Sequence, residues 1–569
     1  GTEGIMNDVL SLKKANCKNC HKCIRSCPVK SIRFSDNQAK IIPEECILCG
    51  RCVVVCPQNA KRVRNDLTEV IGAIGSGKRV IAALAPAFIS EFPVSGIEEM
   101  EELLKKFGFF AAREVAQGAY IVKSDYERMI REKTQDVIIS SCCHTVVTLI
   151  QKYYPAVIPY IAPIISPMMA CARQIKQEYP DAYVVFIGPC ISKKDEMEKL
   201  PGYVDCVLTF DELWQWFEKR GVVLQKQEVD AQGGRASRFF PRTGGIIACM
   251  HTEESTYKYI AVDGVENCVQ AIKEIERGGL KGYFVEMSAC EGSCINGPST
   301  RAYRDNILTS RARVDEYAQP DMHQKPDFDA ACEFGLSRHI ANEFVHEPEP
   351  PEATIIEILA RMGKTRPEHE LNCGSCGYPT CREKAKAVYN GKADITMCLP
   401  YLLENAESFS NNVFAVSPNA ILVLDEQLRI QRMNMPACHM FGIARSQEVI
   451  GTSVIDLIDP TEFQSVLDTG NDIIDKKIYI PEYDLYVELS VVLDAEHHSL
   501  FGIFKDITAE HNRREKYIEK RAKTIDITDK VIEKQMRIVQ EIASLLGETT
   551  AETKIALSQI KNIVRSEDE

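Results

Sequence analysis

Two closely spaced runs of cysteine constrain the fold of this chain more than any other feature. The first run, CKNCHKCIRSCP, begins at Cys17, and the second, CILCGRCVVVCP, begins at Cys46. Each run has the spacing C-x2-C-x2-C-x3-C and ends in proline. The chain holds 23 cysteines and shows no secretory signal, so we expect a cytoplasmic protein whose thiols bind metal instead of forming disulfides.

The doubled run resembles the bacterial two-cluster ferredoxins over about sixty residues. In that family the fourth cysteine of each run binds the other cluster, so the resemblance implies two [4Fe–4S] clusters with crossed ligand sets. Zinc is the alternative, but zinc sites usually show paired C-x2-C runs without this doubling. We expect a ferredoxin domain at residues 6–75. The implied ligand sets are Cys17, Cys20, Cys23 and Cys56 for one cluster, and Cys46, Cys49, Cys52 and Cys27 for the other.

Strand-length apolar segments alternate with amphipathic helical segments from about residue 76. Four of these segments end in unusual sequences, namely RVIAALAP, DVIISSCCH, AYVVFIGPC and GYFVEMSACEGSC. The alternation predicts parallel α/β sheets, which place their sites just beyond the carboxyl ends of the strands. Cysteines from three separate loops can then converge and hold a third cubane. These cysteines are Cys143, Cys190, Cys290 and Cys294.

The motifs resemble those of the iron-only (di-iron) hydrogenases. That family carries T-S-C-C-P, M-P-C-x-x-K-x-x-E and E-x-M-A-C-x-x-G-C, where this chain has SSCCH, GPCISKKDE and EMSACEGSC. The resemblance covers residues 76–345 and implies an H-cluster domain. It implies that the converging cysteines bind the H-cluster cubane. Cys294 would also bridge to a di-iron unit that carries carbon monoxide, cyanide and a bridging azadithiolate.

Roles for five further residues follow from the same resemblance. Lys193 would hold the distal cyanide, with Glu196 as its partner, because a buried ammonium suits an anionic ligand. Ala85 and Pro86 would line the pocket. Cys142 would pass protons to and from the bridgehead amine, since a thiol can relay a proton and an apolar residue cannot. The alternative for Cys142 is a small buried residue that merely packs.

Three residues of these motifs depart from the family pattern. His144 replaces the proline after the double cysteine, Gly188 replaces the methionine before Pro189, and Ser288 replaces the methionine of the last motif. In the family these positions surround the di-iron unit. We therefore expect the polarity and the solvent access of the unit to differ in this chain.

The family's onward proton path, which runs through Glu, Ser and Glu, is incomplete here. An ungapped comparison places Ser124 at the first glutamate, retains Glu127, and places Ala162 at the path serine. Ser124 cannot act as a carboxylic acid, and the Ala162 side chain forms no hydrogen bond. We therefore expect slow proton exchange and a low rate of H2 turnover.

A third cysteine motif follows the linker EPEPPE, which begins at Glu347. Its spacing is C-x2-C-x4-C-x16-C, and it resembles the four-cysteine iron–sulfur domain of corrinoid proteins and related redox proteins. We expect this domain at residues 353–408 and a fourth [4Fe–4S] cluster in it, with zinc as the open alternative. Its cysteines are Cys373, Cys376, Cys381 and Cys398.

Residues 409–508 resemble a PAS sensor domain through the stretches AILVLDEQLRIQRMN, MFGIARSQEVIG and HSLFGIFKDIT. Asn434, Phe441 and the glycines near them fit the loose pattern of that family. Cys438 and His439 are of residue types that can bind a flavin or a haem, but a packed thiol and a surface histidine are the simpler interpretation.

Residues 509–569 are expected to form a coiled-coil helix. Ile525, Ile532 and Val539 recur every seven residues, and the series continues to Leu546. The segment TTAE after it has the spacing of a capping box, which predicts a restarted helix. A helix with a single apolar stripe needs a partner, so we predict a parallel homodimer.

Composition argues against two kinds of partner. The net charge of −13 provides no general basis for binding nucleic acid. The uncharged stretch Tyr153–Ala172 is long enough to resemble a membrane span, but it contains a proline at every fourth residue from Pro155. Prolines remove helical hydrogen bonds, so we expect buried irregular backbone there and no membrane contact.

Together these features predict a multidomain α/β and α+β protein that acts as an H2:acceptor oxidoreductase. The favoured function is a sensory iron-only hydrogenase with low turnover, which passes a redox signal through the clusters and the PAS domain to a kinase or phosphatase. The expected substrates are H2 and protons, and a ferredoxin-like protein is the expected electron partner. One alternative is a metabolic hydrogenase, which would keep its proton path. Another is a non-catalytic hydrogenase-like iron–sulfur protein, against which Lys193, Glu196 and Cys142 argue.

Overall fold

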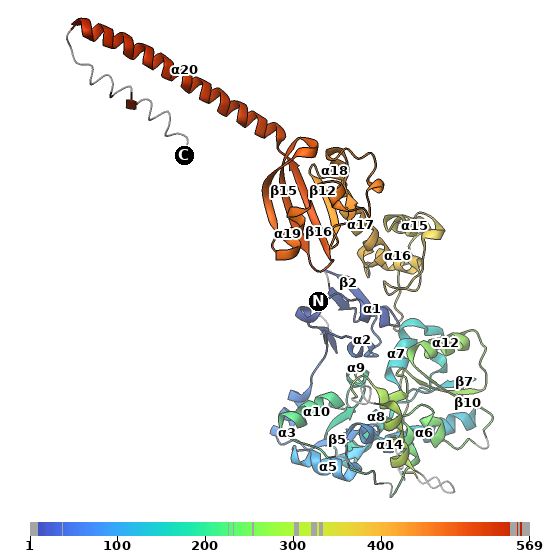
Figure 1. The fold of residues 1–569 in the computed structure, drawn as a ribbon. Helices are drawn as coiled ribbons and strands as arrows, with labels where there is room; N and C mark the ends of the chain where they lie inside the picture. The colour runs from blue at the N-terminus through green and yellow to red at the C-terminus, as the bar shows by residue number, and fades with distance from the viewer. Residues whose placement is uncertain are drawn as a thin grey trace. The chain divides into compact units, whose positions relative to one another are not determined.

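The chain forms two compact units, Gly1–Leu402 and Leu403–Glu569, in the computed structural model of Figure 1. The structure describes residues 9–36, 38–225, 227–230, 233–252, 255–300, 306–319, 327–328, 334–546, 555 and 558–559. Within these ranges no helix is both long and apolar enough to cross a membrane.

Two antiparallel strand pairs flank the N-terminal cysteine runs. Each run enters a short helix directly after a residue with positive φ, His21 (56°) in the first run and Gly50 (73°) in the second. These left-handed residues make the backbone curl tightly within each run. The elements are β1 (Leu10–Leu12) paired with β4 (Lys61–Val63), β2 (Ile32–Ser35) paired with β3 (Gln38–Ile41), η1 (Lys14–Asn16), α1 (Lys22–Ser26) and α2 (Arg51–Val54).

The central domain contains two sheets in which every described pairing is parallel. One sheet has the order β6-β5-β8-β9 and the other has the order β10-β11-β7. All residues of β5 are buried, which explains why its sequence is continuously apolar instead of alternating. The predicted parallel α/β architecture is confirmed. The strands are β5 (Val80–Leu84), β6 (Ala111–Glu114), β7 (Val137–Ile139), β8 (Tyr183–Gly188), β9 (Cys206–Thr209), β10 (Lys258–Asp263) and β11 (Tyr283–Ser288).

Helices connect these strands, as the alternation in the sequence predicted (Figure 1). The helix that follows β8 is central to the site described below, because it begins just after Cys190. The helices are α3 (Leu67–Gly75), α4 (Phe88–Glu91), α5 (Ile97–Lys106), α6 (Val115–Glu132), α7 (His144–Tyr153), α8 (Pro167–Glu178), α9 (Ser192–Lys199), α10 (Phe210–Lys219), α11 (Gly245–Cys249), α12 (Val265–Glu276) and α14 (Ile307–Ala318), with 3-10 turns at Pro155–Tyr160, Ala236–Phe239 and Ser293–Asn296.

The proline-containing stretch Tyr153–Ala172 is only partly irregular. Residues Pro155–Tyr160 form a 3-10 turn, but α8 begins at Pro167. A proline at the first position of a helix costs no helical hydrogen bond, because the N–H at that position has no partner in the helix. The expectation of irregular backbone throughout was therefore wrong from Pro167 onward.

The third cysteine motif lies in a small helical domain that packs on the N-terminal one. Phe34 N donates a hydrogen bond to the Lys392 carbonyl oxygen (2.8 Å), and Lys392 Nζ pairs with Glu45 Oε2 (2.6 Å). Tyr378 is 4% exposed and lies in one apolar cluster with Ile24. The helices are α15 (Glu352–Arg361), α16 (Cys381–Tyr389) and α17 (Leu399–Val416), with 3-10 turns at Pro367–His369 and Ile395–Met397.

The second unit contains an antiparallel sheet with the order β13-β12-β16-β15-β14. Asn434 is buried, and its side chain accepts from the backbone of Ile421 and Ala437 and donates to the carbonyl of Phe414 in α17. Cys438 is 2% exposed. The elements are β12 (Ala420–Asp425), β13 (Ile430–Met433), α18 (Met435–Met440), α19 (Thr461–Thr469), β14 (Ile473–Ile480), β15 (Leu485–Asp494) and β16 (Ser499–Asp506), with 3-10 turns at Ser446–Glu448, Val454–Asp456 and Pro481–Tyr483.

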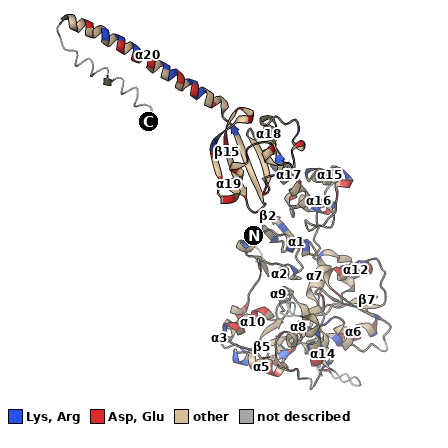
Figure 2. Ribbon diagram, viewed as in Figure 1, with Lys and Arg blue, Asp and Glu red and all other residues tan. Residues whose placement is uncertain are grey.

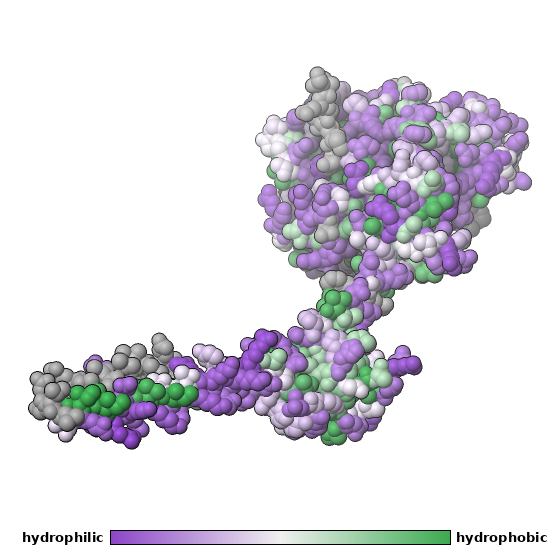
Figure 3. Space-filling view, turned by 90° about the horizontal axis from the view of Figure 1, so that it is seen from above, coloured by the Kyte–Doolittle hydropathy of each residue, from purple (hydrophilic) through white to green (hydrophobic). Residues whose placement is uncertain are grey.

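A single long helix, α20 (Thr508–Leu546), follows the sheet. Acidic and basic residues alternate along its ribbon in Figure 2, and Figure 3 shows apolar residues gathered along one side. Ile527 and Val531 are 62% and 52% exposed. They belong to an exposed apolar row beside the predicted heptad positions Ile525, Ile532 and Val539, which are half-buried, so the coiled coil stays a prediction. The capping box at Thr549 and Glu552 lies outside the described residues.

The exposed row of α20 generates the first prediction. A chain truncated after Asp506 lacks α20 and is expected to be monomeric, whereas the full chain is expected to be a dimer, because the apolar stripe then has a second copy to pack against. Light scattering of both proteins measures this difference. A truncated chain that remains dimeric would show that the contact lies elsewhere.

Candidate functional site

A cavity lies beyond the carboxyl ends of β5, β7, β8 and β11, where the four unusual sequences were expected to meet. It contains about 710 Å³ of empty space, part of which is open to solvent. Its wall is largely apolar and carries a few polar groups, as is usual for sites that bind small ligands. The residues singled out from the sequence that line it are Ala85, Pro86, Cys142, Cys143, Pro189, Cys190, Lys193, Ser288 and Cys294.

Gly188 and His144 were also expected around the pocket, but neither lines it. A Cβ at Gly188 would lie 2.6 Å from two ring carbons of Phe186, and Phe186 itself lines the cavity. The Phe186 ring thus occupies the space that a side chain at position 188 would need. His144 is 4% exposed, and its Nε2 lies 2.6 Å from Asp195 Oδ2. Asp195 lies in α9, so this contact directs the His144 side chain, at the first position of α7, to α9 instead of the cavity.

The four cysteines expected at the central cubane lie close together. Burial raises the pKa of the Cys290 thiol, and the nearby charges of Cys190, Cys143 and Cys294 raise it further. Thiolates crowded in this way repel one another unless a positive metal core compensates them. In the described part of the chain, no three His, Cys, Asp or Glu side chains are placed to hold a single metal ion. Evidence that a set of cysteines has room for an iron–sulfur cluster therefore comes from the cavity that the set lines.

The cysteines of the N-terminal domain fall into two groups. The charges of Cys56, Cys17 and Cys20 raise the pKa of Cys23, in addition to the larger effect of burial. Burial likewise raises the pKa of Cys49 to about 12, with a further contribution from Cys27. The charge of Cys56 thus acts on the first run and that of Cys27 on the second, and the crossed ligand sets stay a prediction.

The second group lies next to the central cysteines. Cys49 and Cys290 line one cavity of about 500 Å³, which is bordered by Arg51. The Arg51 guanidinium contacts Glu266 and lies 3.6 Å from Glu291, so ionic contacts join the two domains at this point. Cys49 of the N-terminal domain and Cys290 of the central domain therefore lie close to each other.

Lys193 and Glu196 form an ion pair at the wall of the main cavity. Lys193 Nζ lies 2.5 Å from Glu196 Oε2 and donates to the Cys142 carbonyl (3.1 Å). Burial alone would lower the pKa of Lys193, but the Glu196 charge outweighs it and the pKa is raised. Burial alone would raise the pKa of Glu196, but Lys193 lowers it, with help from Arg338, which lies 3.5 Å away. Both side chains therefore remain charged at neutral pH.

Cys142 faces the cavity and contacts a residue that the sequence analysis missed. Its Sγ lies 3.2 Å from the hydroxyl of Tyr126, and burial raises the pKa of the thiol to about 12. The Tyr126 hydroxyl also lies 3.1 Å from Ser141 Oγ, which donates to the Ile164 carbonyl (3.0 Å). Helical spacing puts Tyr126 on the face of α6 that carries Val115 and Ala119, but spacing alone does not reveal its contact with Cys142.

The other residues of the expected proton path lie away from the cavity. Ser124 Oγ donates to the carbonyl of Tyr120 (2.9 Å), and Glu127 accepts hydrogen bonds from the backbone N and Nδ1 of His251. Ala162 is fully buried. None of these three side chains contacts Cys142 among the described hydrogen bonds, so the structure does not bring them together with the thiol.

The third cysteine motif lines a cavity of its own, with about 360 Å³ of empty space. Two buried lysines, Lys364 and Lys384, share this cavity with the cysteines. Burial lowers the pKa of Lys384 to about 8, and the nearby charges of Cys376 and Cys398 oppose this shift. The cysteines that line the cavity are Cys373, Cys376, Cys381 and Cys398.

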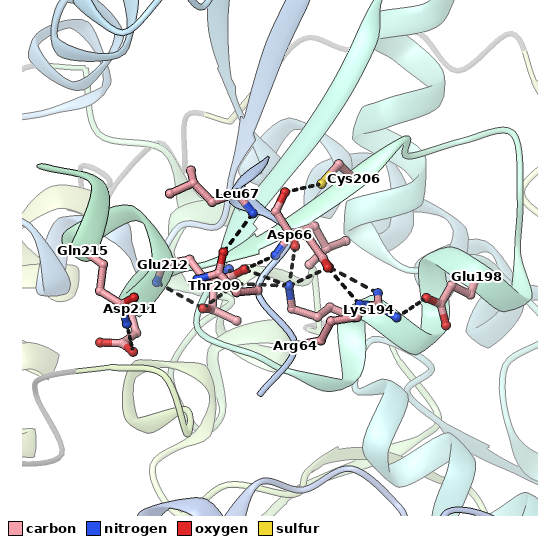
Figure 4. Close-up of polar contacts among 12 residues, drawn as sticks. Arg64, Asp66, Leu67, Lys194, Glu198, Cys206, Thr209, Asp211, Glu212 and Gln215 are labelled. Carbon is pink, nitrogen blue, oxygen red and sulfur yellow. Dashed lines mark hydrogen bonds and ion pairs between the residues drawn. The ribbon is translucent and has the colours of Figure 1, made fainter. Parts of the chain in front are cut away.

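A buried ionic network fixes the opposite side of α9 (Figure 4). Lys194 is fully buried, and its Nζ lies 2.8 Å from Asp66 Oδ2 and 3.0 Å from Glu212 Oε2. Arg64 pairs with Asp66 (2.8 Å) and with Glu198 in α9 (2.6 Å). Arg64 and Asp66 belong to the segment that leaves the N-terminal domain after β4, so this network ties that segment to the helix that carries Lys193.

Comparison with known families identifies the domains. Residues 78–298 match the family described as "Iron only hydrogenase large subunit, C-terminal domain". The central domain is a hydrogenase-family domain. Residues 10–57 match a 4Fe-4S dicluster domain, residues 408–507 match the PAS fold, and residues 370–400 match a family model for an Fe-S cluster. The predicted hydrogenase-like, ferredoxin-like and PAS domains are confirmed, whereas their exact boundaries and the roles of individual residues stay predictions.

The relatives of the central domain include a hydrogenase and proteins that are not named as hydrogenases. Iron hydrogenase 1 of Clostridium pasteurianum is 22% identical over 368 residues, which are 51% of this chain and 64% of that protein. Nuclear prelamin A recognition factor of Xenopus laevis is 22% identical over 340 residues, 46% of this chain and 74% of that protein. Cytosolic iron-sulfur assembly component 3 of Mus musculus is also 22% identical, over 46% and 71%. Among solved structures, an apo [FeFe]-hydrogenase of Chlamydomonas reinhardtii is 19% identical with a TM-score of 0.40, and the match covers 50% of this chain and 100% of that one.

The network around Lys194 generates the second prediction. Lys194→Ala is expected to lower the free energy of unfolding by about 3–5 kcal/mol, because it leaves two buried carboxylates without their shared cation. Denaturant titration of the full chain measures this loss. The matched control is Lys199→Ala in the same helix, whose side chain is 34% exposed and whose effect is expected to stay below about 1 kcal/mol. Equal losses in the two variants would contradict the role of the network.

Proposed function

We propose that the chain is a sensory iron-only hydrogenase, which oxidises H2 reversibly at low turnover and passes a redox signal through iron–sulfur clusters and the PAS domain to a signalling partner. The observation that carries this proposal is the Lys193–Glu196 ion pair beside Cys142 and Cys294. The ion pair places an ammonium beside the Cys142 thiol, so one cavity wall offers both a cation for an anionic small ligand and a group that can exchange a proton.

The residues present fit an anionic metal centre with small ligands. Cys143, Cys190 and Cys294 line the cavity together with Lys193, so negative and positive groups face the same space. The Lys193 ammonium is anchored by Glu196 and by a backbone carbonyl, which leaves its remaining donor capacity for a ligand such as cyanide. When bound, the di-iron unit would supply the site at which H2 is split into protons and electrons.

Proton transfer at Cys142 is the step that we expect to be slow. The thiol stays protonated at neutral pH, since burial raises its pKa to about 12. Its neighbour Tyr126 can donate and accept, and Ser141 can do the same. The chain of hydrogen bonds then ends at the Ile164 carbonyl, which only accepts. A path of this kind supports slow exchange with solvent, as a sensor requires, and it does not favour a metabolic hydrogenase.

The route for a redox signal leads through the four-cysteine domain. Cys398 immediately precedes α17, and α17 leads along the chain into β12 of the PAS domain. The Phe414 carbonyl of α17 accepts a hydrogen bond from Asn434 at the edge of the PAS core (3.1 Å). We propose that a change in the charge at Cys398 reaches the PAS domain along this helix, and that a homodimer of α20 presents the result to a kinase or phosphatase.

A non-catalytic iron–sulfur protein is the second candidate. It is favoured by the relatives whose names refer to prelamin recognition and to iron-sulfur assembly. Lys193, Glu196 and Cys142 argue against it, because they combine an ammonium with a thiol that can exchange protons, and electron transfer by a cubane alone needs no proton relay.

Turnover of the matured protein supplies the third prediction. We expect the wild type to oxidise H2 far more slowly than fast metabolic hydrogenases. Cys142→Ala should lower the rate by a further factor of about 10²–10⁴, because a positioned acid–base group is lost. Dye-linked H2 uptake measures both rates.

The matched control for Cys142→Ala is Cys171→Ala. Cys171 is another fully buried thiol of the same domain, but its Sγ lies 3.7 Å from the Glu114 carbonyl and does not line the cavity. Its removal should leave the rate unchanged. An unchanged rate in Cys142→Ala would contradict the relay, and a wild-type rate equal to that of fast enzymes would contradict the sensory function.

A further inference from the structure

Lys384 is a buried cation beside the third cysteine motif. It lies in α16, it is 1% exposed, and it lines the same cavity as the four cysteines. Its Nζ donates a hydrogen bond to the carbonyl oxygen of Asp394. In the ranges that the structure describes, this ammonium forms no ion pair with a carboxylate within the usual distance. The Asp394 carboxylate acts on Lys384 only at longer range, so the ammonium brings to the cavity a positive charge that no carboxylate pairs with directly.

An ammonium in this position is unfavourable unless an anion lies nearby. Removal of a charge from water costs far more than one carbonyl hydrogen bond returns. The four cysteines that line the same cavity would supply that anion when they bind metal as thiolates. A [4Fe–4S] core with four cysteine thiolates carries a net negative charge in both of its common redox states, so the buried lysine and the cluster would compensate each other.

We propose that the Lys384 ammonium is the counter-ion of an anionic iron–sulfur cluster at Cys373, Cys376, Cys381 and Cys398, and that it raises the reduction potential of that cluster. This inference rests on the proposed function only in assuming that the four-cysteine site holds an iron–sulfur cluster. It assigns to a lysine of α16 the role of tuning the last redox centre before the PAS domain.

Buried lysines also lie beside the cysteines of the N-terminal domain. Lys61 is 6% exposed and donates to the carbonyl of Ala39 (2.5 Å), a residue of the apolar cluster that contains Cys23 and Cys52. Lys152 is 9% exposed and donates to the carbonyl of Cys46 itself (2.8 Å). In each case a buried ammonium bound to main-chain carbonyls lies next to a cluster ligand, which supports a common electrostatic role.

The effect on the potential follows from the charge balance. When the cluster is reduced it takes up one electron from its donor, no bond forms or breaks, and its net charge becomes one unit more negative. A nearby ammonium stabilises the reduced state more than the oxidised state, most strongly where water is excluded. Loss of the ammonium should therefore make the cluster harder to reduce, in line with the general dependence of such potentials on local charge.

The test is a potentiometric titration of the full-length, iron-loaded chain, followed by electron paramagnetic resonance. Lys384→Met keeps the length of the side chain and removes its charge. At a fixed solution potential it should lower the ratio of reduced to oxidised cluster at this site at least tenfold, which corresponds to about 59 mV for one electron. Lys384→Arg keeps the charge and should restore most of the ratio.

The matched control is Lys386→Met. Lys386 lies two residues further along α16, but its side chain is 39% exposed and pairs with Glu349 at the surface (2.7 Å). It removes the same charge outside the cavity and should leave the ratio unchanged. A wild-type ratio in Lys384→Met with the cluster intact, or an equal shift in the two methionine variants, would overturn the proposal. So would zinc in place of iron at this site.

If Lys384→Met fails to retain its cluster, thermal unfolding of the chain with and without iron tests whether Lys384 compensates the charge of the cluster. Without iron, the variant should be at least as stable as the wild type, since an uncompensated buried charge is gone. Iron loading should then stabilise the wild type more than the variant, and the reverse order would overturn the proposal. A missing di-iron unit would affect the infrared spectrum and the H2 rate but not this titration, so the two failures are distinguishable.

Discussion

The ionic contacts of helix α9 are the interactions on which the rest of the site depends. The helix begins just after Cys190, and its Lys193 lines the cavity and pairs with the buried Glu196, while Lys194 is held by Asp66 and Glu212 on the other side. Because buried charges fix both sides of the helix, Lys193 is held at a constant distance from Cys190, a predicted metal ligand. The same contacts connect the segment that leaves the ferredoxin-like domain to the wall of the cavity.

Charge compensation in a dry interior links the separate sites. Each set of crowded cysteines has a buried lysine close to it: Lys61 and Lys152 in the N-terminal domain, Lys193 in the central one, and Lys384 in the four-cysteine domain. Thiolates repel one another where water is excluded, and metal cores and ammonium groups offset that repulsion. We propose that these cations, placed beside ligand sets that are all cysteine, tune the redox centres.

The sequence predicted the parts of the site that depend on local pattern. Cysteine spacing and continuous apolar strands were enough to place Cys143, Cys190 and Cys294 at strand ends in one cavity. The contact of Tyr126 with Cys142 depends on how α6 packs against a strand end, and sequence spacing alone does not determine that packing. The direction of His144 was likewise unpredictable, because it is set by the first turn of α7 and by its Asp195 partner. The docking of the four-cysteine domain on the ferredoxin-like one depends on contacts between residues far apart in the chain.

Infrared spectroscopy of the matured, full-length protein tests the central claim most directly, because iron-bound carbon monoxide and cyanide absorb where proteins do not. The account predicts bands of both ligands in the wild type. It also predicts that Lys193→Ala loses or shifts the cyanide bands, while Lys199→Ala in the same helix keeps the wild-type spectrum. A wild-type protein that has its iron–sulfur clusters but shows no such bands after maturation would contradict the account and identify a hydrogenase-like protein without the di-iron unit.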